Sequence, residues 1–201
     1  MRFDQQLLFE RLLGLGSRSA AGFALCITER LLPSLSRYTS ADETIDPKIV
    51  TETLDLVWEW CAGAPVQGND ATRRIDSCKQ IIHQLSQAEQ IIAKYAEDAV
   101  LSLSYALRAY TIGPQEAGWA AQCGYEAVDY FVTEEGGVDY AAVGEGAVLN
   151  HPVVQRELHR QEEDVLYLEK LTDAGEPTKA SMQRLRERAR FQSQTVFALD
   201  D

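Results

Sequence analysis

The sequence predicts an all-α protein: a single-domain bundle of about seven or eight helices over residues 1–201, ending in a helical hairpin. Apolar residues recur at the 3.6-residue helical spacing along most of the chain. Val, Ile and Thr do not gather into the alternating runs with tight turns that a sheet requires. The 201 residues are 45% hydrophobic, which is enough for a sizeable core. These observations favour a helical domain over a sheet protein or a disordered chain.

The first helix is predicted over residues 3–13, where Leu8 and Leu12 lie one turn apart. Gly14 and Gly16 follow this stretch, and we expect them to end the helix.

A second helix is predicted from Ser19 to Tyr38. Its inward-facing residues are Phe23, Ile27 and Leu31. Pro33 lies inside this segment, so we expect a kink or an early stop there.

The third helix has a clear start, because Asp46 suits the N-cap and Pro47 suits the first helical position. One apolar stripe of this helix consists of Val50, Leu54, Val57 and Cys61, and a neighbouring one consists of Ile49, Leu56 and Trp60. The remaining narrow face carries Lys48, Glu52, Asp55 and Glu59. A helix that is apolar over such a wide arc is expected to be central, with only an acidic sliver in water.

Three further helices are predicted over Asp70–Leu85, 89–112 and 115–134. Gly113-Pro114 separates the last two. Because 115–134 is rich in Ala and Gly, we expect it to pack closely against the helix before it. Residues 135–150 contain four glycines and are expected to form the longest irregular connection.

The last third of the chain predicts an antiparallel helical hairpin. One helix is marked by Val154, Leu158, Val165 and Leu168, and the return helix by Met182, Leu185 and Ala189. Between them, Gly175 is expected to end the first helix and Pro177 to occupy the first position of the second. Glu157, Gln161 and Asp164 have the spacing of a stripe exposed to water.

Charge is abundant and unevenly distributed. The formal net charge is −12, which disfavours binding to nucleic acid. Residues 42–59 sum to −5 and 89–146 to −8, whereas 179–190 sum to +4. One interpretation is a solubilising surface, and the other is an electrostatic face for a basic protein partner. For such a face Trp60 and Trp119 are candidate anchors, although core packing is the favoured interpretation for each.

The sequence predicts neither a membrane span nor a cofactor. No run of about 18 apolar residues occurs, and Asp4, Glu10 and Arg11 interrupt the apolar N-terminal stretch, so we expect no secretory signal and a cytoplasmic location. The four cysteines form no CxxC pair, which disfavours a zinc site and favours buried thiols. Common catalytic motifs are missing, and no catalytic residue or metal ligand is predicted.

One constellation of charged residues remains. We expect Arg30 to lie within ion-pair distance of Asp55 or Glu59 if the second and third helices are neighbours. Together with Glu29, these residues form either a structural ion pair or a polar pocket for a ligand or an acid/base group.

Two motifs carry a family resemblance. The first, Phe-x-x-Cys-x-x-Glu-Arg-x-x-Pro, is matched by Phe23, Cys26, Glu29, Arg30 and Pro33. The second is matched by Leu54, Asp55, Leu56, Val57, Trp58 and Glu59, and a third element is partly matched by Pro152 and Val154. With these motifs the chain resembles the YjaG-like family of bacterial proteins. The resemblance implies an all-helical cytoplasmic protein of uncharacterised biochemical function.

Two functions follow as hypotheses. The first is a non-enzymatic acidic protein that binds another protein, for example an immunity-type inhibitor of a basic toxin. The alternative is a small-ligand binder or enzyme that uses the charged cluster between the second and third helices. The candidate binding residues are Glu29, Arg30, Glu52, Asp55, Glu59, Trp60 and Trp119.

Overall fold

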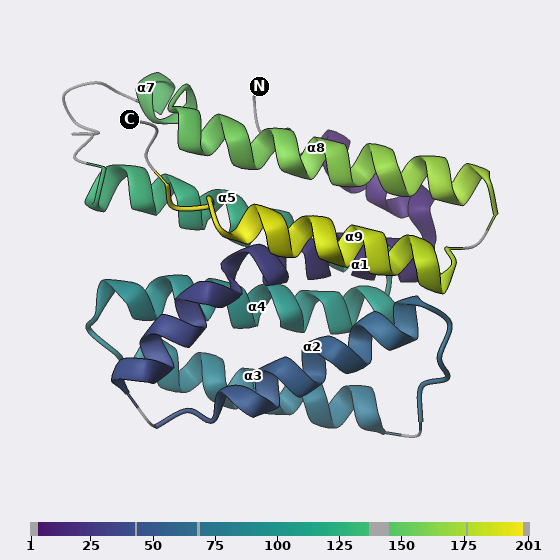
Figure 1. The fold of residues 1–201 in the computed structure, drawn as a ribbon, viewed down its shortest axis with the longest axis horizontal. Coiled ribbons are helices and arrows are strands. Elements are labelled where there is room, and N and C mark those ends of the chain that lie inside the picture. The colour runs from purple at the N-terminus through teal and green to yellow at the C-terminus, as the bar shows by residue number, and fades with distance from the viewer. Residues whose placement is uncertain (1–3, 43, 68, 137–144, 176, 199–201) are drawn as a thin grey trace.

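The computed structural model describes residues 4–42, 44–67, 69–136, 145–175 and 177–198 (Figure 1). These residues form eight α-helices, one 3-10 turn and no strand, which confirms the predicted all-α fold. The helices are α1 (Gln5–Ala41), α2 (Pro47–Cys61), α3 (Asp70–Ser86), α4 (Ile91–Thr111), α5 (Ala117–Glu134), α7 (Glu145–Leu149), α8 (Pro152–Asp173) and α9 (Lys179–Ser193), and the turn η1 spans Pro114–Glu116.

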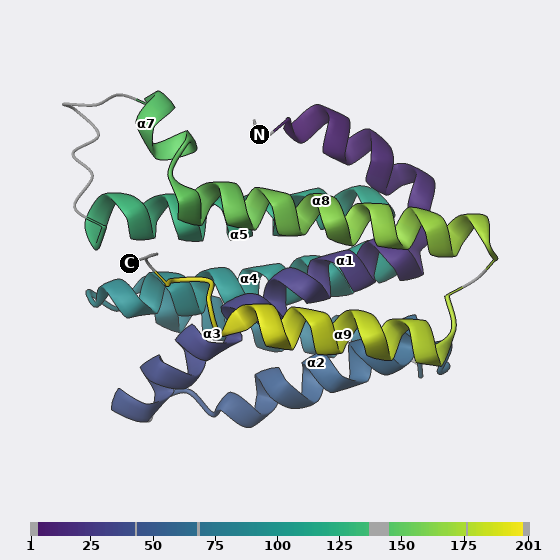
Figure 2. The same cartoon turned by 45° about the horizontal axis from the view of Figure 1, so that its top comes forward.

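The central element is α1, which packs against α2, α4, α5, α8 and α9. Figure 2 shows it running between α5 and α9. Every residue over 19–31 is buried, including Thr28, Glu29 and Arg30. A helix buried on all sides belongs to the interior of a bundle. The prediction that the helix 47–61 is central is therefore wrong, because α2 covers one side of the bundle and keeps its acidic face in water.

The predicted first two helices are joined without a loop. Gly16 has a positive φ of 74° with ψ 163°, and the helix changes direction there (Figure 2). Gly14 does not interrupt the helix, so only Gly16 plays the predicted role. Pro33 does not stop the second segment, which continues to Ala41. The proline ring is exposed to solvent.

Replacing Gly16 by alanine is expected to destabilise the protein by about 1–3 kcal/mol, because this backbone conformation is nearly restricted to glycine. A Cβ atom at Gly16 would meet no other atom within 4 Å, so the loss would be conformational and not steric. Chemical denaturation followed by circular dichroism measures it. Gly14→Ala is the control, because that Cβ would also meet nothing and the φ there is not positive. Equal stabilities of the two variants would contradict the assignment of the break to Gly16.

The middle of the chain follows the prediction closely. Asp46 caps α2 by accepting a hydrogen bond from the Lys48 backbone N–H, and Pro47 is its first residue. The pair α4 and α5 are packed neighbours. Of the predicted irregular connection 135–150, residues 137–144 lie outside the described residues, whereas Glu145–Leu149 is helical, which corrects that part.

The terminal hairpin is present as α8 and α9, which are antiparallel in Figures 1 and 2. Gly175 ends the first helix with φ 123° as predicted. Pro177 is not the first residue of α9, because Thr178 is the N-cap and exchanges a capping-box pair of hydrogen bonds with Ser181. Both helices pack on α1, and the Tyr167 hydroxyl donates a hydrogen bond to the Ser181 carbonyl between them.

Candidate functional site

Arg30 lies in a buried ion network with α8. Its Nη2 donates to Glu157 Oε1 at 2.9 Å and its Nη1 to Asp164 Oδ2 at 2.7 Å. The three side chains are 1%, 3% and 0% exposed. The prediction that Arg30 pairs with Asp55 or Glu59 is therefore wrong. Burial alone lowers the pKa of Arg30, but the two carboxylates outweigh it and raise that pKa, so the guanidinium stays charged.

The predicted water-exposed stripe on the hairpin helix is also wrong. Glu157, Gln161 and Asp164 are all buried and face α1 and α5. Gln161 donates one hydrogen bond to the Ala121 carbonyl and another to Glu157. The network needs a close approach of α5, since a Cβ at Gly124 would lie 3.0 Å from Glu157 Oε1. With so little exposure, this network holds the helices together and offers no opening to a ligand.

Glu29 lies at the centre of a second network. It is consecutive with Arg30, so the two side chains point about 100° apart around α1 and reach different neighbours. Its carboxylate accepts hydrogen bonds from Trp58 Nε1 at 3.1 Å, Arg186 Nε at 2.6 Å and Arg190 Nε at 3.1 Å. Arg186 Nη2 also donates to Asp55 Oδ1. This second network borders solvent, because Asp55 is 59% exposed and Arg190 54% exposed.

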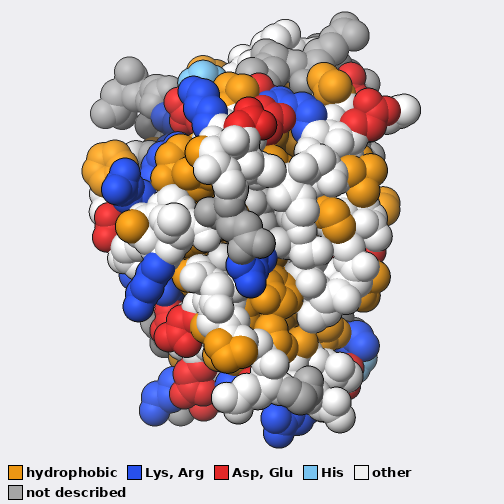
Figure 3. Space-filling view, turned by 90° about the vertical axis from the view of Figure 1, so that its right-hand side faces the viewer, with side chains coloured by type: hydrophobic (Ala, Val, Ile, Leu, Met, Phe, Trp, Pro, Cys, Tyr) orange, Lys and Arg blue, Asp and Glu red, His pale blue; other side chains and the backbone are white. Residues whose placement is uncertain are grey.

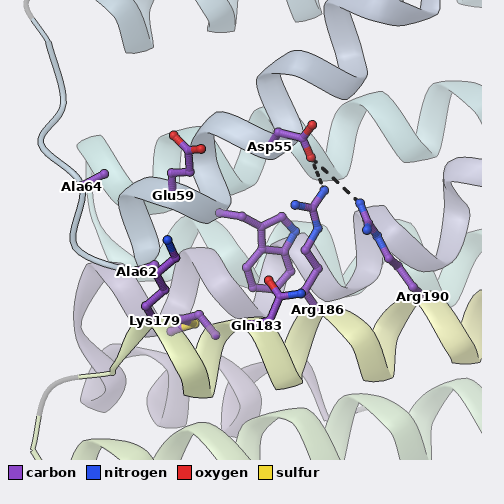
Figure 4. Close-up of a pocket in the computed structure, with 10 residues that line it drawn as sticks. Asp55, Glu59, Ala62, Ala64, Lys179, Gln183, Arg186 and Arg190 are labelled. Carbon is purple, nitrogen blue, oxygen red and sulfur yellow. Dashed lines mark hydrogen bonds and ion pairs between the residues drawn. The ribbon is translucent and has the colours of Figure 1, made fainter.

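A groove of about 680 Å³ opens beside this network, between α2 and α9 (Figure 4). We call it the α2–α9 groove. Its lining residues are Asp55, Trp58, Glu59, Ala62, Ala64, Lys179, Met182, Gln183, Arg186 and Arg190. Figure 3 views the end of the molecule that carries the α2–α3 and α8–α9 connections, where apolar side chains come to the surface among charged ones.

The two sides of the α2–α9 groove carry opposite charge. Lys179, Gln183, Arg186 and Arg190 follow one another along α9 at helical spacing. On α2, Asp55 and Glu59 are one turn apart. Asp55 is paired with arginine, whereas Glu59 and Lys179 make no ion pair within the described part of the chain. In Figure 4 these two unpaired groups lie at the same end of the groove.

The remaining predicted site residues have separate places. Glu52 is exposed on the same side of α2 as Asp55 and Glu59. Trp60 is only 1% exposed and its ring centre lies 5.8 Å from that of Tyr110, so the favoured interpretation of core packing is confirmed and Trp60 is not a surface anchor. Trp119 is 45% exposed beside Phe9, so the favoured interpretation of core packing is wrong for this residue.

The basic side of the groove was missed from the sequence. The charge pattern indicates only a positive segment over residues 179–190, without a partner for Lys179, Arg186 or Arg190. The signal that identifies them is their spacing of seven and four residues, which places all three on one face of α9. Trp58, a residue of the second family motif, donates a hydrogen bond to Glu29 and lines the groove.

The four cysteines are buried and free, as predicted. Burial raises the pKa of the Cys61 and Cys78 thiols to about 12, which keeps both protonated near neutral pH. Over the described residues, no group of three or more His, Cys, Asp or Glu side chains is arranged to hold a metal ion. In the same part of the chain, no helix combines the length and the apolar character needed to cross a membrane.

The family model "Protein of unknown function (DUF416)" matches residues 7–196. The chain belongs to the DUF416 family. A crystal structure of a DUF416 family protein from Shewanella baltica has the same fold, with a TM-score of 0.76 and 20% sequence identity over 90% of this chain and 92% of that chain. No curated protein matches the sequence. The predicted resemblance to an uncharacterised helical family is thus confirmed at the level of DUF416.

Proposed function

We propose that this DUF416 protein acts without catalysis, by binding another protein whose contacting surface is basic. The contact surface is the acidic side of α2, which carries Glu52, Asp55 and Glu59, together with the α2–α9 groove that it borders. The observation that carries the proposal is Glu59, a carboxylate on the rim of the groove with no ion pair among the described residues. A cationic side chain from a partner would supply the missing pair.

The arrangement of α9 supports this polarity. Three arginines of its basic segment are paired within the protein, because Arg186 and Arg190 bind Glu29, and Arg188 binds Asp164 at 2.5 Å. These pairs reduce the positive charge that α9 presents to a partner, in a chain whose formal net charge is −12. Such a surface attracts a cationic partner over distances of about 10 Å at ordinary salt.

An immunity-type inhibitor that covers a basic toxin is the specific form that we propose. A charged recognition surface suits such an inhibitor. The proposal includes a cytoplasmic location and the YjaG-like assignment within DUF416. Trp119 is exposed and supplies a second, aromatic contact in this proposal.

The test is the association rate of a partner recovered from the host, measured against ionic strength. We expect the rate to fall about tenfold or more between low and physiological salt, because electrostatic steering is screened. Glu52→Lys and Glu59→Lys should each slow association. Glu134→Lys on α5 is the control, since it changes net charge equally at an exposed acidic residue on another helix. A rate that is indifferent to salt, or equal effects of all three variants, would contradict the proposed surface.

A second candidate function, a small-ligand binder or enzyme, is favoured by the size of the groove. Its volume of about 680 Å³ falls within the usual range for ligand pockets. Glu59 and Lys179 would then contact a ligand that carries both charges. Native mass spectrometry of the protein purified from the host separates the two functions, because a retained small molecule without a protein partner supports this second one.

A further inference from the structure

The groove network has the composition of a receptor for a guanidinium group. Arg186 is held by two carboxylates, since its Nε donates to Glu29 and its Nη2 to Asp55. Its Cζ lies 5.9 Å from the centre of the Trp58 ring. Carboxylate forks and an aromatic face are the groups that recognise arginine in complexes between proteins. Here the chain's own Arg186 occupies them.

Arg186 can leave this receptor without stranding a buried charge. Glu29 is only 2% exposed, but it also binds Arg190 at 3.1 Å and Trp58 at 3.1 Å, so it keeps a cation and a donor. A buried carboxylate that loses its only cationic partner is costly, but Glu29 avoids this cost because Arg190 stays bound to it. Asp55 is already more than half exposed, so its carboxylate is reachable from the groove.

The attachment of α9 does not depend on Arg186 either. The helix is anchored to the core by Met182, Leu185 and Ala189, which are all buried. Met182 also approaches Gly22 of α1, where a Cβ would lie 3.3 Å from its sulfur. The Arg186 side chain therefore reaches α2 as an arm from a helix that is held by other residues.

We propose that a protein partner inserts an arginine into this receptor and displaces Arg186 from Asp55 and the Trp58 face. The inference rests on the proposed function and names the partner residue that the surface recognises. The exchange replaces one guanidinium by another on the same groups, so it preserves the charge balance of the buried network. Glu59 lies one turn after Asp55 on α2 and makes no ion pair within the described residues. Its carboxylate therefore adds attraction for the incoming cation.

The receptor is tested first with a small probe. Arg186→Gln empties the site, and an arginine blocked at both ends is titrated while the indole N–H signal of Trp58 is followed by NMR. We expect binding to this variant to be at least about tenfold tighter than to the unaltered protein, and tighter than binding of an equally blocked lysine, which lacks the planar fork. Arg184→Gln is the control, because that exposed residue lies on the same helix outside the groove lining.

The exchange is tested with the recovered partner. Arg186→Gln should strengthen its binding several-fold more than Arg184→Gln, which changes the charge equally. If the Trp58 signal does not respond to the blocked arginine, the receptor is wrong, even where a protein partner binds elsewhere on the surface. If the partner binds but Arg186→Gln weakens it, the exchange is wrong while the proposed function stands. If the blocked arginine binds and no protein partner is recovered, the receptor stands and the protein-binding function fails.

Discussion

Replacing Arg30 by alanine is expected to lower the free energy of unfolding by about 3–5 kcal/mol. The substitution leaves Glu157 and Asp164, which are 3% and 0% exposed, without the cation that bridges them. Glu157 then keeps no ion pair among the described residues in a region that water does not reach, whereas Asp164 keeps only Arg188. A buried carboxylate that has lost its cation is costly. Urea denaturation followed by circular dichroism measures the loss.

The matched control is Arg190→Ala. That arginine also binds a buried carboxylate, Glu29, but it is 54% exposed and Arg186 remains as a second cation. Its loss should cost less than about 1 kcal/mol. A double substitution of Arg30 and Asp164 should cost less than the sum of the single substitutions, because the two groups depend on each other. A loss below about 1 kcal/mol for Arg30→Ala would show that the network does not stabilise the fold.

The second large effect concerns Asp98 on α4. Its side chain is 1% exposed, Oδ1 accepts a hydrogen bond from Lys94 Nζ at 3.0 Å, and Oδ2 is buried without a hydrogen-bond partner among the described residues. The pKa of Asp98 is raised to about 7, and burial is the largest cause. Lys94 opposes this increase, whereas the carboxylates of Glu126 and Glu97 add to it. The folded protein therefore retains a proton that the unfolded chain releases near pH 4.

The sign of the pH dependence follows from this difference. Below about pH 4 the Asp98 carboxyl is protonated in both states, and as pH rises towards 7 only the unfolded state gains from ionising. Stability is lost over this window at up to about 1.4 kcal/mol per pH unit. Asp98→Asn cannot ionise, so its stability relative to the unaltered protein should improve by about 3–4 kcal/mol from pH 4 to pH 8.

Denaturation of both proteins across this pH range provides the measurement, and Lys94→Met is the second variant. Removing the ammonium group that favours the Asp98 carboxylate should raise the folded-state pKa of Asp98, so that the loss of stability still begins near pH 4 but extends to higher pH and becomes larger. A difference between Asp98→Asn and the unaltered protein that stays constant with pH would contradict the assignment.

Local features of this protein were readable from the sequence. The start of α2 at Asp46 and Pro47, the break at Gly16 and the end of α8 at Gly175 depend on backbone rules that act within a few residues. The all-α class depends on apolar spacing, which is likewise a property of each segment. The burial of the four cysteines followed from the apolar segments that contain them.

The partners of the charged residues were decided by the tertiary structure alone. Helical spacing places Glu157, Gln161 and Asp164 on one face, but a polar stripe has the same spacing whether it faces water or a buried arginine. Arg30 is 127 residues before Glu157 in the chain, and only the packing of α8 against α1 brings them together.

The groove shows the same division. The acidic side could be predicted from the sequence, since Asp55 and Glu59 are one turn apart on α2. The positive charge of the α9 segment was also visible in the sequence, but not the residues with which it pairs. Glu29 and Arg30 are neighbours in sequence yet belong to separate networks, because consecutive residues on a helix point in different directions. Periodicity determines the face on which a side chain lies, whereas the helix that covers this face is determined by the packing of the whole core.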